Sequence, residues 1–131
     1  MKTVCVIIGF LAFSLTASAQ KDTLIGPHQG RLFKSGAYRL EVLGCNDYLE
    51  IYLYDSDREA ILNYGIHGNV EFYYKGETYL NAPVVCYGED GFTAKIASPD
   101  FLYAKVSLVV YGNFVYVKFE NECSITGRAG K

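Results

Sequence analysis

The sequence predicts an all-β fold, an antiparallel β-sandwich of immunoglobulin-like type with about seven to nine short strands. Three observations lead to this prediction. Apolar and polar residues alternate with a period of two in several short segments, which is typical of half-buried strands. Turn residues recur about every eight to twelve residues, the spacing expected of a sandwich or small barrel. No segment has a sustained apolar period of 3.6, so the crossover helices that parallel sheets require are missing.

The first clear strands lie between residues 38 and 54. In residues 38–42, apolar positions alternate with Arg39 and Glu41. A turn cluster at 44–47 separates this segment from residues 48–54, where aliphatic side chains share one face and tyrosines share the other. A second turn follows at 55–57, with the sequence Asp-Ser-Asp.

The remaining strands follow the same pattern. We expect them over residues 70–74, 79–87, 92–96, 103–110 and 114–119, with turns between them. The last two segments form the clearest pair. Two sheets packed face to face would bury the aliphatic residues of these strands. The predicted core includes Leu40, Val42, Leu49, Ile51, Leu53, Val106, Leu108, Val115 and Val117.

The two ends of the chain have their own patterns. Residues 1–19 combine Lys2, a short apolar run and small residues at 17–19, which predicts a secretory signal peptide cleaved after Ala19. The product would be secreted or periplasmic. Residues 20–29 are polar and contain Gly26-Pro27, so we expect a flexible N-terminal arm or a short edge segment. The β-sandwich domain is expected over residues 30–123, followed by a frayed C-terminal tail at 124–131.

Composition narrows the classes of function. The formal net charge is −2, and no basic stripe is available to neutralise phosphates, so nucleic-acid binding is not expected. After cleavage, no apolar stretch is long enough for a transmembrane segment. The sequence has no nucleophile elbow, no ordered Ser-His-Asp set and no phosphate-binding glycine loop. We therefore predict a protein that is not an enzyme and that needs no cofactor.

The tyrosines are the main functional signal in the pattern. All 12 lie after residue 19, and there is no tryptophan. Tyr48, Tyr52 and Tyr54 alternate on one face of the predicted strand, and the same surface is expected to extend to Tyr73, Tyr103 and Tyr116 on neighbouring strands. Tyrosine provides contact area at low entropic cost, so this face is a candidate binding surface. The alternative is an ordinary strand surface with tyrosines packed under loops.

Histidines and cysteines allow a second hypothesis. His28 and His67 are the only histidines, and a cysteine could join them in a metal site. The alternative places His28 in the mobile arm and His67 in a turn. Cleavage also removes Met1, the only methionine, which excludes methionine-based copper binding. Three cysteines remain, so one disulfide is expected in an oxidising compartment; Cys45 with Cys123 is preferred over the pairings that use Cys86.

Part of the chain resembles a known family. The stretches GPHQGRLFKSGAYRLEVL (residues 26–43) and YLEIYLYDSDREAI (residues 48–61) resemble small exported bacterial β domains with a Pro-His-Gly-Gly motif. Such domains are associated with periplasmic adaptors of heavy-metal efflux systems. The chain departs from the pattern at Gln29, where glycine is common, and at Ala60, where proline is common. The resemblance implies an exported β-sandwich in an envelope setting, near metal handling.

These observations predict an exported, non-enzymatic binding module of the bacterial envelope. Its partner would be an envelope protein, in a setting of metal efflux. Two alternatives stay open at this point: a metal-binding protein that uses the two histidines and a cysteine, and a secreted structural or adhesive β protein with no small ligand. The sequence predicts neither the partner nor the oligomeric state.

Overall fold

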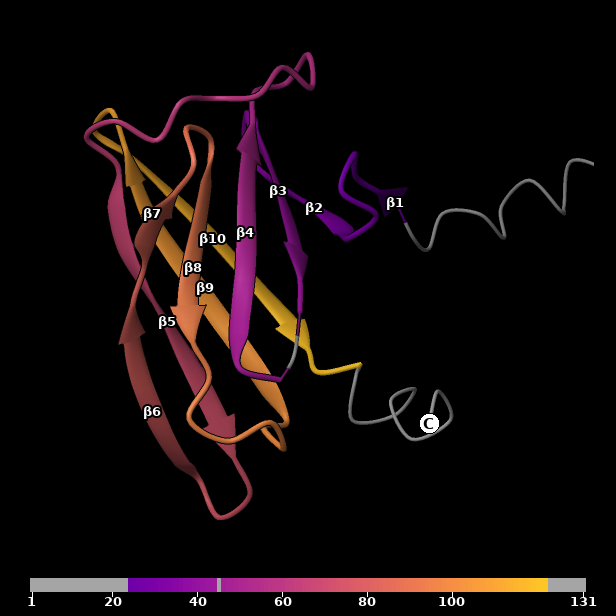
Figure 1. The fold of residues 1–131 in the computed structure, drawn as a ribbon, viewed down its shortest axis with the longest axis vertical. Coiled ribbons are helices and arrows are strands. Elements are labelled where there is room, and N and C mark those ends of the chain that lie inside the picture. The colour runs from indigo at the N-terminus through magenta and orange to yellow at the C-terminus, as the bar shows by residue number, and fades with distance from the viewer. Residues whose placement is uncertain (1–23, 45, 123–131) are drawn as a thin grey trace, which may run out of the picture.

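The computed structural model describes residues 24–44 and 46–122 of the chain. This part has ten strands and no helix, arranged as two antiparallel sheets that form a sandwich (Figure 1). The predicted all-β sandwich is confirmed. The strands are β1 (Leu24–Ile25), β2 (Arg31–Ser35), β3 (Tyr38–Leu43), β4 (Tyr48–Tyr54), β5 (His67–Tyr74), β6 (Thr78–Pro83), β7 (Val85–Tyr87), β8 (Gly91–Lys95), β9 (Tyr103–Val110) and β10 (Asn113–Glu120).

The two sheets differ in size. The six-stranded sheet has the order β1-β2-β3-β4-β8-β7, and the four-stranded sheet has the order β10-β9-β5-β6. The longest ladder joins β9 and β10 through a tight turn, with Asn113 opposite Val110. β5 joins the same sheet on the other side of β9. Antiparallel neighbours of this kind need only short connections, which agrees with the closely spaced turn residues of the sequence.

The core lies between the sheets and is formed by every second residue of the strands. All nine predicted core residues are buried, none more than 5% exposed. Aromatic rings fill the rest of the space. Phe72 and Phe101 meet edge to face, with ring centroids 5.0 Å apart, and Phe92 is fully buried beside them in the same cluster. Period-two alternation therefore predicted the core correctly.

One long edge segment passes from one sheet to the other. The sequence predicts a single strand over residues 79–87, whereas the structure has β6 in the four-stranded sheet and β7 in the six-stranded sheet. Val84 lies between them, and its N–H donates to the carbonyl of Gly68 at 3.1 Å. Pro83 ends β6 because it has no N–H to continue the ladder. This crossing joins the two sheets along one side of the sandwich.

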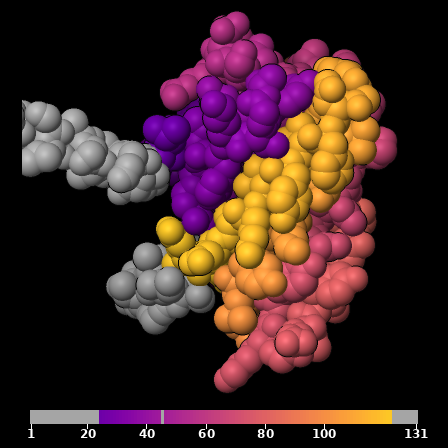
Figure 2. Space-filling view, turned by 180° about the vertical axis from the view of Figure 1, so that it is seen from behind, coloured from indigo at the N-terminus to yellow at the C-terminus, as the bar shows by residue number. Residues whose placement is uncertain are grey.

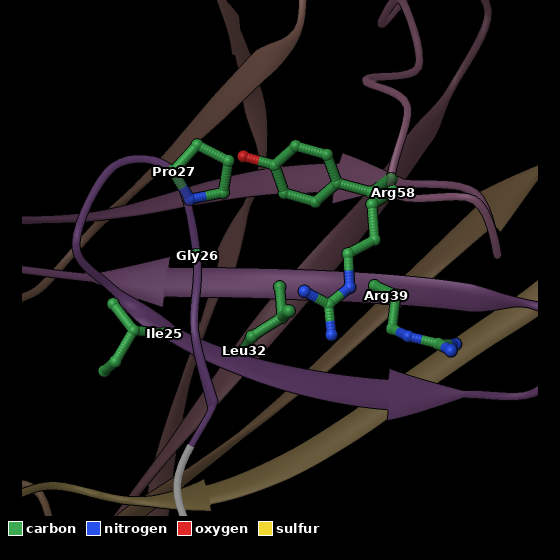
Figure 3. Close-up of a pocket in the computed structure, with 7 residues that line it drawn as sticks. Ile25, Gly26, Pro27, Leu32, Arg39 and Arg58 are labelled. Carbon is green, nitrogen blue, oxygen red and sulfur yellow. The ribbon is translucent and has the colours of Figure 1, made fainter.

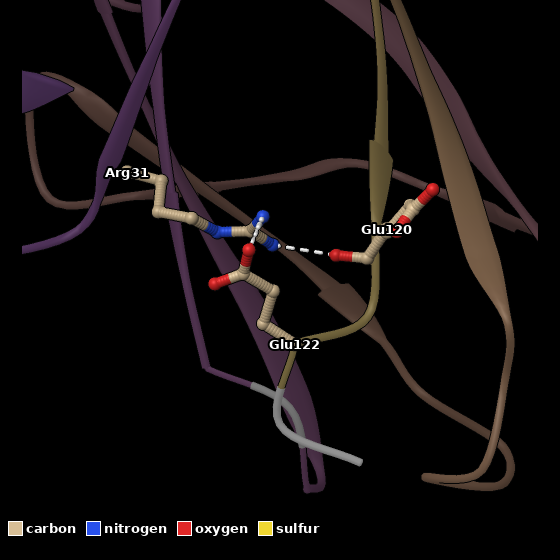
Figure 4. A network of polar contacts seen from close by, with 3 residues as sticks. All are labelled: Arg31, Glu120 and Glu122. Atoms are coloured by element: carbon tan, nitrogen blue, oxygen red, sulfur yellow. Dashed lines mark hydrogen bonds and ion pairs between the residues drawn. The ribbon is translucent and has the colours of Figure 1, made fainter. Parts of the chain in front are cut away.

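β2 and β10 close the opposite side, where the N-terminal strands lie beside β10 (Figure 2). The Arg31 side chain connects them (Figure 4). It donates to the carbonyl of Glu120 at 2.7 Å and lies 3.4 Å from a carboxylate oxygen of Glu122. Its guanidinium also lies over the rings of Phe33 and Phe119. Because the ion pair is partly exposed, it contributes little. The cation–π contacts and the hydrogen bond to the backbone account for most of the stabilisation that Arg31 provides.

The described part of the expected N-terminal arm begins with a short strand. Leu24 and Ile25 pair with Leu32 and Arg31 of β2, so the described part of the arm contains the short edge segment that was the alternative. β2 itself is not evident from alternation because both of its faces are covered: Leu32 is buried on one side and Phe33 is half-buried on the other. These two strands and the division of residues 79–87 explain why the described chain has ten strands.

Some expectations fall outside the described residues. The predicted signal peptide, the Cys45–Cys123 disulfide and the C-terminal tail all involve residues outside 24–44 and 46–122. No helix in the described residues is long and apolar enough to cross a membrane.

Candidate functional site

The outer face of the six-stranded sheet is covered by a turn at residues 26–30. The N–H of Gly26 donates to the carbonyl of Gly30, and the N–H of Gln29 donates to the carbonyl of Gly26, both at 2.9 Å. This closed turn follows β1 and leads into β2. Its sequence is Gly-Pro-His-Gln-Gly. The motif thus forms a cap over the outer face of the sheet.

The turn closes over a buried carboxylate, Glu41 of β3. The Glu41 side chain is fully buried. One carboxylate oxygen accepts the N–H groups of His28 at 2.9 Å and Gly30 at 2.7 Å. The other accepts the hydroxyl of Tyr54 at 2.7 Å. A buried carboxylate is costly unless it is hydrogen-bonded, and these three donors offset that cost.

Two glycines of the turn are required by close packing. A Cβ at Gly26 would lie 2.5 Å from a carboxylate oxygen of Glu41, and a Cβ at Gly30 would lie 2.6 Å from the carbonyl oxygen of Val42. Gln29 has a φ of 70°, in the left-handed region that glycine adopts with least strain. Glycine at position 29 would therefore adopt this backbone conformation with less strain.

The turn also covers two of the predicted binding tyrosines. The ring of His28 stacks on Tyr52 with centroids 3.7 Å apart, and Tyr52 and Tyr54 are 6% and 5% exposed. Burial raises the pKa of both tyrosines, and hydrogen bonds to Glu50 and Glu41 raise the pKa of Tyr52 and Tyr54 further. These side chains hold the cap in place and leave little surface for a partner.

The other predicted tyrosines lie apart from this pair. Tyr48 begins β4 and is 51% exposed, with the ammonium of Lys95 over its ring. Tyr73 lies on the other sheet, so the structure does not unite the four predicted residues into one surface. Strand pairing, which local alternation does not determine, places Tyr73 with a different set of neighbours.

Tyr73 is the centre of an aromatic stack that crosses three strands. Its ring stacks on Tyr79 of β6 at 5.1 Å and on Tyr103 of β9 at 4.7 Å between centroids. Lys105 lies over Tyr73, and Lys118 of β10 lies over Tyr103. We call Tyr73, Tyr79, Tyr103, Lys105 and Lys118 the tyrosine stack. It occupies the outer face of the four-stranded sheet.

The ring faces of Tyr73 and Tyr103 are already covered, whereas Tyr79 stacks on Tyr73 with one face and is 52% exposed. Tyr73 has a tyrosine on each side, and Tyr103 lies between a tyrosine and a lysine. The hydroxyl of Tyr73 donates to Glu71 at 2.7 Å, and this bond raises the pKa of Tyr73 to about 12. Ring edges and hydroxyl groups of Tyr73 and Tyr103, and the second ring face of Tyr79, therefore remain for contact.

The stack continues into the edge formed by β6 and β7. Residues 78–87 contain no charged side chain, and large apolar groups are exposed there: Tyr79, Leu80, Val85 and Tyr87. Natural edge strands are usually protected by charges or short length. Here Pro83 is the one protecting residue within the segment.

The candidate metal ligands are separated by the fold. His28 lies in the turn on the six-stranded sheet, whereas His67 begins β5 of the four-stranded sheet. Cys86 is an exposed free thiol on β7, and Cys45 and Cys123 lie outside the described residues. Within residues 24–44 and 46–122, no three His, Cys, Asp or Glu side chains are grouped so that they could hold a metal ion.

A pocket of about 220 Å³ lies between the N-terminal segment and the six-stranded sheet (Figure 3). Its walls combine apolar groups with two arginines, Arg39 of β3 and Arg58 of the loop after β4. Reasoning from the sequence did not identify this pocket. In the sequence, Arg39 is one of the polar residues of an alternating strand, and Arg58 follows a turn cluster. Neither position indicates a pocket.

Comparison of the chain with protein-family models, with curated proteins and with solved structures found no match in any of the three.

Proposed function

We propose that the protein is an exported, non-enzymatic binding module of the bacterial envelope that acts by protein–protein contact. The observation that carries this proposal is the continuity of the tyrosine stack with the uncharged β6–β7 edge. Tyrosine is enriched at the centres of protein interfaces, and an exposed strand edge offers backbone N–H and C=O groups to a partner strand. The pattern of residues 1–19 supports export, and the resemblance of residues 26–61 supports the envelope setting.

The contact surface we propose includes Tyr79 and Tyr103 on the outer face of the sheet, and Leu80, which projects from the other face of β6 at the exposed edge. It replaces the strand face predicted from the sequence, because Tyr52 and Tyr54 are buried beneath the cap. A partner strand that pairs with β6 would lie next to Tyr79, and the lysines at the far side of the stack would contact the rim. Rim charges of this kind influence association rate and specificity more than affinity.

The test is capture of partners from an envelope extract with the wild-type protein and with Tyr79→Ser and Tyr103→Ser. We expect the captured partner to be lost with both variants. The control is Tyr64→Ser, because Tyr64 is 73% exposed but lies in the loop between β4 and β5, outside the stack. Retention of every partner by both stack variants would refute the proposed surface. Equal loss with Tyr64→Ser would indicate a nonspecific effect.

A Leu80→Lys variant tests the edge separately. Leu80 is 49% exposed, so a lysine there stays solvated and places a charge where an apolar partner strand would lie. We expect weaker capture with only a small loss of thermal stability, because Leu80 is half-buried opposite Phe72. Export is tested by N-terminal sequencing of protein recovered outside the cytoplasm, which should begin at Gln20. An intact Met1 on that protein would contradict cleavage after Ala19, and absence of the protein from every fraction outside the cytoplasm would contradict export.

A further inference from the structure

The open edge of the four-stranded sheet is formed by β6, which lies at the margin of the molecule and pairs with β5 alone among the described strands (Figure 1). Four successive residues, 78–81, are exposed there. The N–H of Val84 donates to the carbonyl of Gly68, and this pair continues the β5–β6 register directly after the pair of Pro83 with Asn69. Hydrogen-bonded pairs alternate along an antiparallel ladder, so the even-numbered residues of β6 are those that bond to β5.

The odd-numbered residues of β6 point their backbone groups away from β5. They are Tyr79, Asn81 and Pro83. Pro83 has no N–H, which agrees with its place in a pair that is not hydrogen-bonded to β5. The open edge of β6 therefore presents two donors, the N–H groups of Tyr79 and Asn81, together with the carbonyl groups of the same residues.

These free backbone groups fit a second copy of the same strand. If two β6 strands run antiparallel about a two-fold axis at Leu80, Tyr79 of each copy lies opposite Asn81 of the other. Each of these two pairs exchanges two N–H···O bonds, so every free donor and acceptor of both residues is used. An axis at Asn81 would instead place Tyr79 opposite Pro83, which cannot donate.

The side chains fit the same register. Leu80 lies opposite Phe72 on the inner face, yet it is 49% exposed because nothing covers the edge within the described residues. At the axis it would face Leu80 of the second copy in a non-hydrogen-bonded pair, whose Cα atoms are about 4.5 Å apart. On the outer face, the two Tyr79 residues would be diagonal neighbours about 7–8 Å apart, within reach of aromatic rings. The tyrosine stacks of the two copies would then form one surface.

The charge pattern favours a second copy over a different protein as the occupant of this edge. Residues 78–87 contain no charged side chain. A two-fold axis brings each nearby side chain close to its own counterpart, so a charge near the axis would repel itself. A different protein imposes no such condition, because it can present the opposite charge.

The opposite edge of the same sheet is already engaged, which limits the assembly to two copies through this sheet. The N–H of Tyr116 in β10 donates to Oγ of Ser35 at 3.1 Å, and the carbonyl of Glu120 accepts from Arg31. β2 therefore covers the β10 edge, and a second copy can add at β6 alone.

From this geometry we infer that the β6 edge binds a second copy of the chain, which joins the two four-stranded sheets into one sheet of eight strands. The inference rests on the proposed function, because it names the strand that pairs with β6 at that site. The tyrosine face of the dimer stays open for the envelope partner.

The experiment is sedimentation velocity over a range of concentrations, with protein produced from the full-length chain. We expect a reversible dimer with a Kd on the order of 10 μM, because a single pair of edge strands makes a small interface. A monomer at every concentration up to about 1 mM would overturn the inference.

The axis is tested by charges at position 80. Leu80→Lys should weaken the dimer about tenfold or more, because two ammonium groups would face each other. Leu62→Lys is the matched control: Leu62 is 48% exposed but lies in the loop between β4 and β5, so the dimer should persist. A mixture of Leu80→Lys with Leu80→Glu should restore association, which also shows that both variants fold. Unchanged dimerisation of Leu80→Lys, or no association in the mixture, would overturn the inference.

The backbone bonds are tested at Asn81. Asn81→Pro removes a donor that points away from β5, so the fold should persist while the dimer weakens about tenfold or more. Asn81→Ala keeps the N–H and should still dimerise. A dimer of normal strength in Asn81→Pro would overturn the inference.

Tyr103→Ser separates this inference from the proposed function, because Tyr103 lies two strands away from the edge. We expect this variant to lose the envelope partner and to remain dimeric. If the wild-type protein is monomeric while Tyr103→Ser loses the partner, the dimer is refuted and the proposed function stands. If the protein dimerises as expected while Tyr103→Ser and Tyr79→Ser keep every partner, the proposed contact surface fails and the dimer stands.

Discussion

The buried carboxylate of Glu41 leads to the sharpest prediction about stability. The perturbation is Glu41→Ala, which removes the acceptor of three hydrogen bonds at once. The N–H of Gly30 and the hydroxyl of Tyr54 are buried donors, whereas the N–H of His28 is only partly buried and can reach water. The substitution therefore leaves two buried donors without a partner beneath the cap.

The magnitude follows from those two donors. A buried donor without a partner costs about 1–3 kcal/mol, so two cost about 2–6 kcal/mol, and the lost packing of the side chain adds to this. We expect the free energy of unfolding to fall by about 3–5 kcal/mol, a large part of the 5–15 kcal/mol typical of a domain. Glu41→Gln keeps one acceptor oxygen and the shape of the side chain. It should cost roughly 1–2 kcal/mol.

The assay is equilibrium unfolding in urea, with the slope compared between variants to confirm that the folded states are equally compact. Glu71→Ala is the matched control. Glu71 lies on the outer face of the other sheet and accepts one hydrogen bond from a tyrosine, so its loss should cost under about 1 kcal/mol. Hydrogen exchange at the amide of Gly30 should accelerate in Glu41→Ala alone. A cost for Glu41→Ala no larger than that of Glu71→Ala would refute the reasoning.

Three further predictions concern the same cap. Gln29→Gly should stabilise the protein by up to about 1 kcal/mol in thermal unfolding, because φ at this position is 70°; destabilisation would show that the Gln29 side chain makes a contact that matters more. Gly26→Ala should destabilise by about 1–3 kcal/mol in urea, since its Cβ would overlap Glu41; an unchanged midpoint would contradict this packing. Burial raises the pKa of Tyr52 and Tyr54 above 10.0 in the folded protein. The contribution of these two tyrosines to the free energy of unfolding is therefore complete below pH 10 and is lost as the pH rises through their folded-state pKa values. Stability should fall above pH 10 by at most about 1.4 kcal/mol per pH unit for each tyrosine, and Tyr52→Phe should reduce that slope.

Local alternation was sufficient to predict most of the fold. Leu49, Ile51 and Leu53 occupy every second position and are almost completely buried. β2 was missed because Leu32 and Phe33 are covered on opposite faces, which removes the alternation. Residues 79–87 were predicted as one strand because a change of sheet at Val84 has no local signature apart from Pro83.

The candidate sites were less predictable than the fold. Tyr52 and Tyr73 have the same pattern in the sequence, each on the polar side of an alternating strand. Tyr52 is buried by a turn that lies more than 20 residues earlier in the chain, whereas Tyr73 stacks with Tyr79 and Tyr103 through strand pairing. Arg39 and Arg58 come together because β3 and the loop after β4 meet the N-terminal segment. None of these contacts is local in sequence.

The sequence by itself therefore determined the class of fold and the inward face of most strands. These properties follow from side-chain periodicity and from backbone preferences, which act over a few residues. The tertiary structure alone decided which polar faces stay open. A strand has two faces and two edges, and what covers each of them depends on segments distant in sequence. For that reason Glu41 is a buried anchor, the tyrosine stack is a candidate interface, and Arg39 and Arg58 share a pocket.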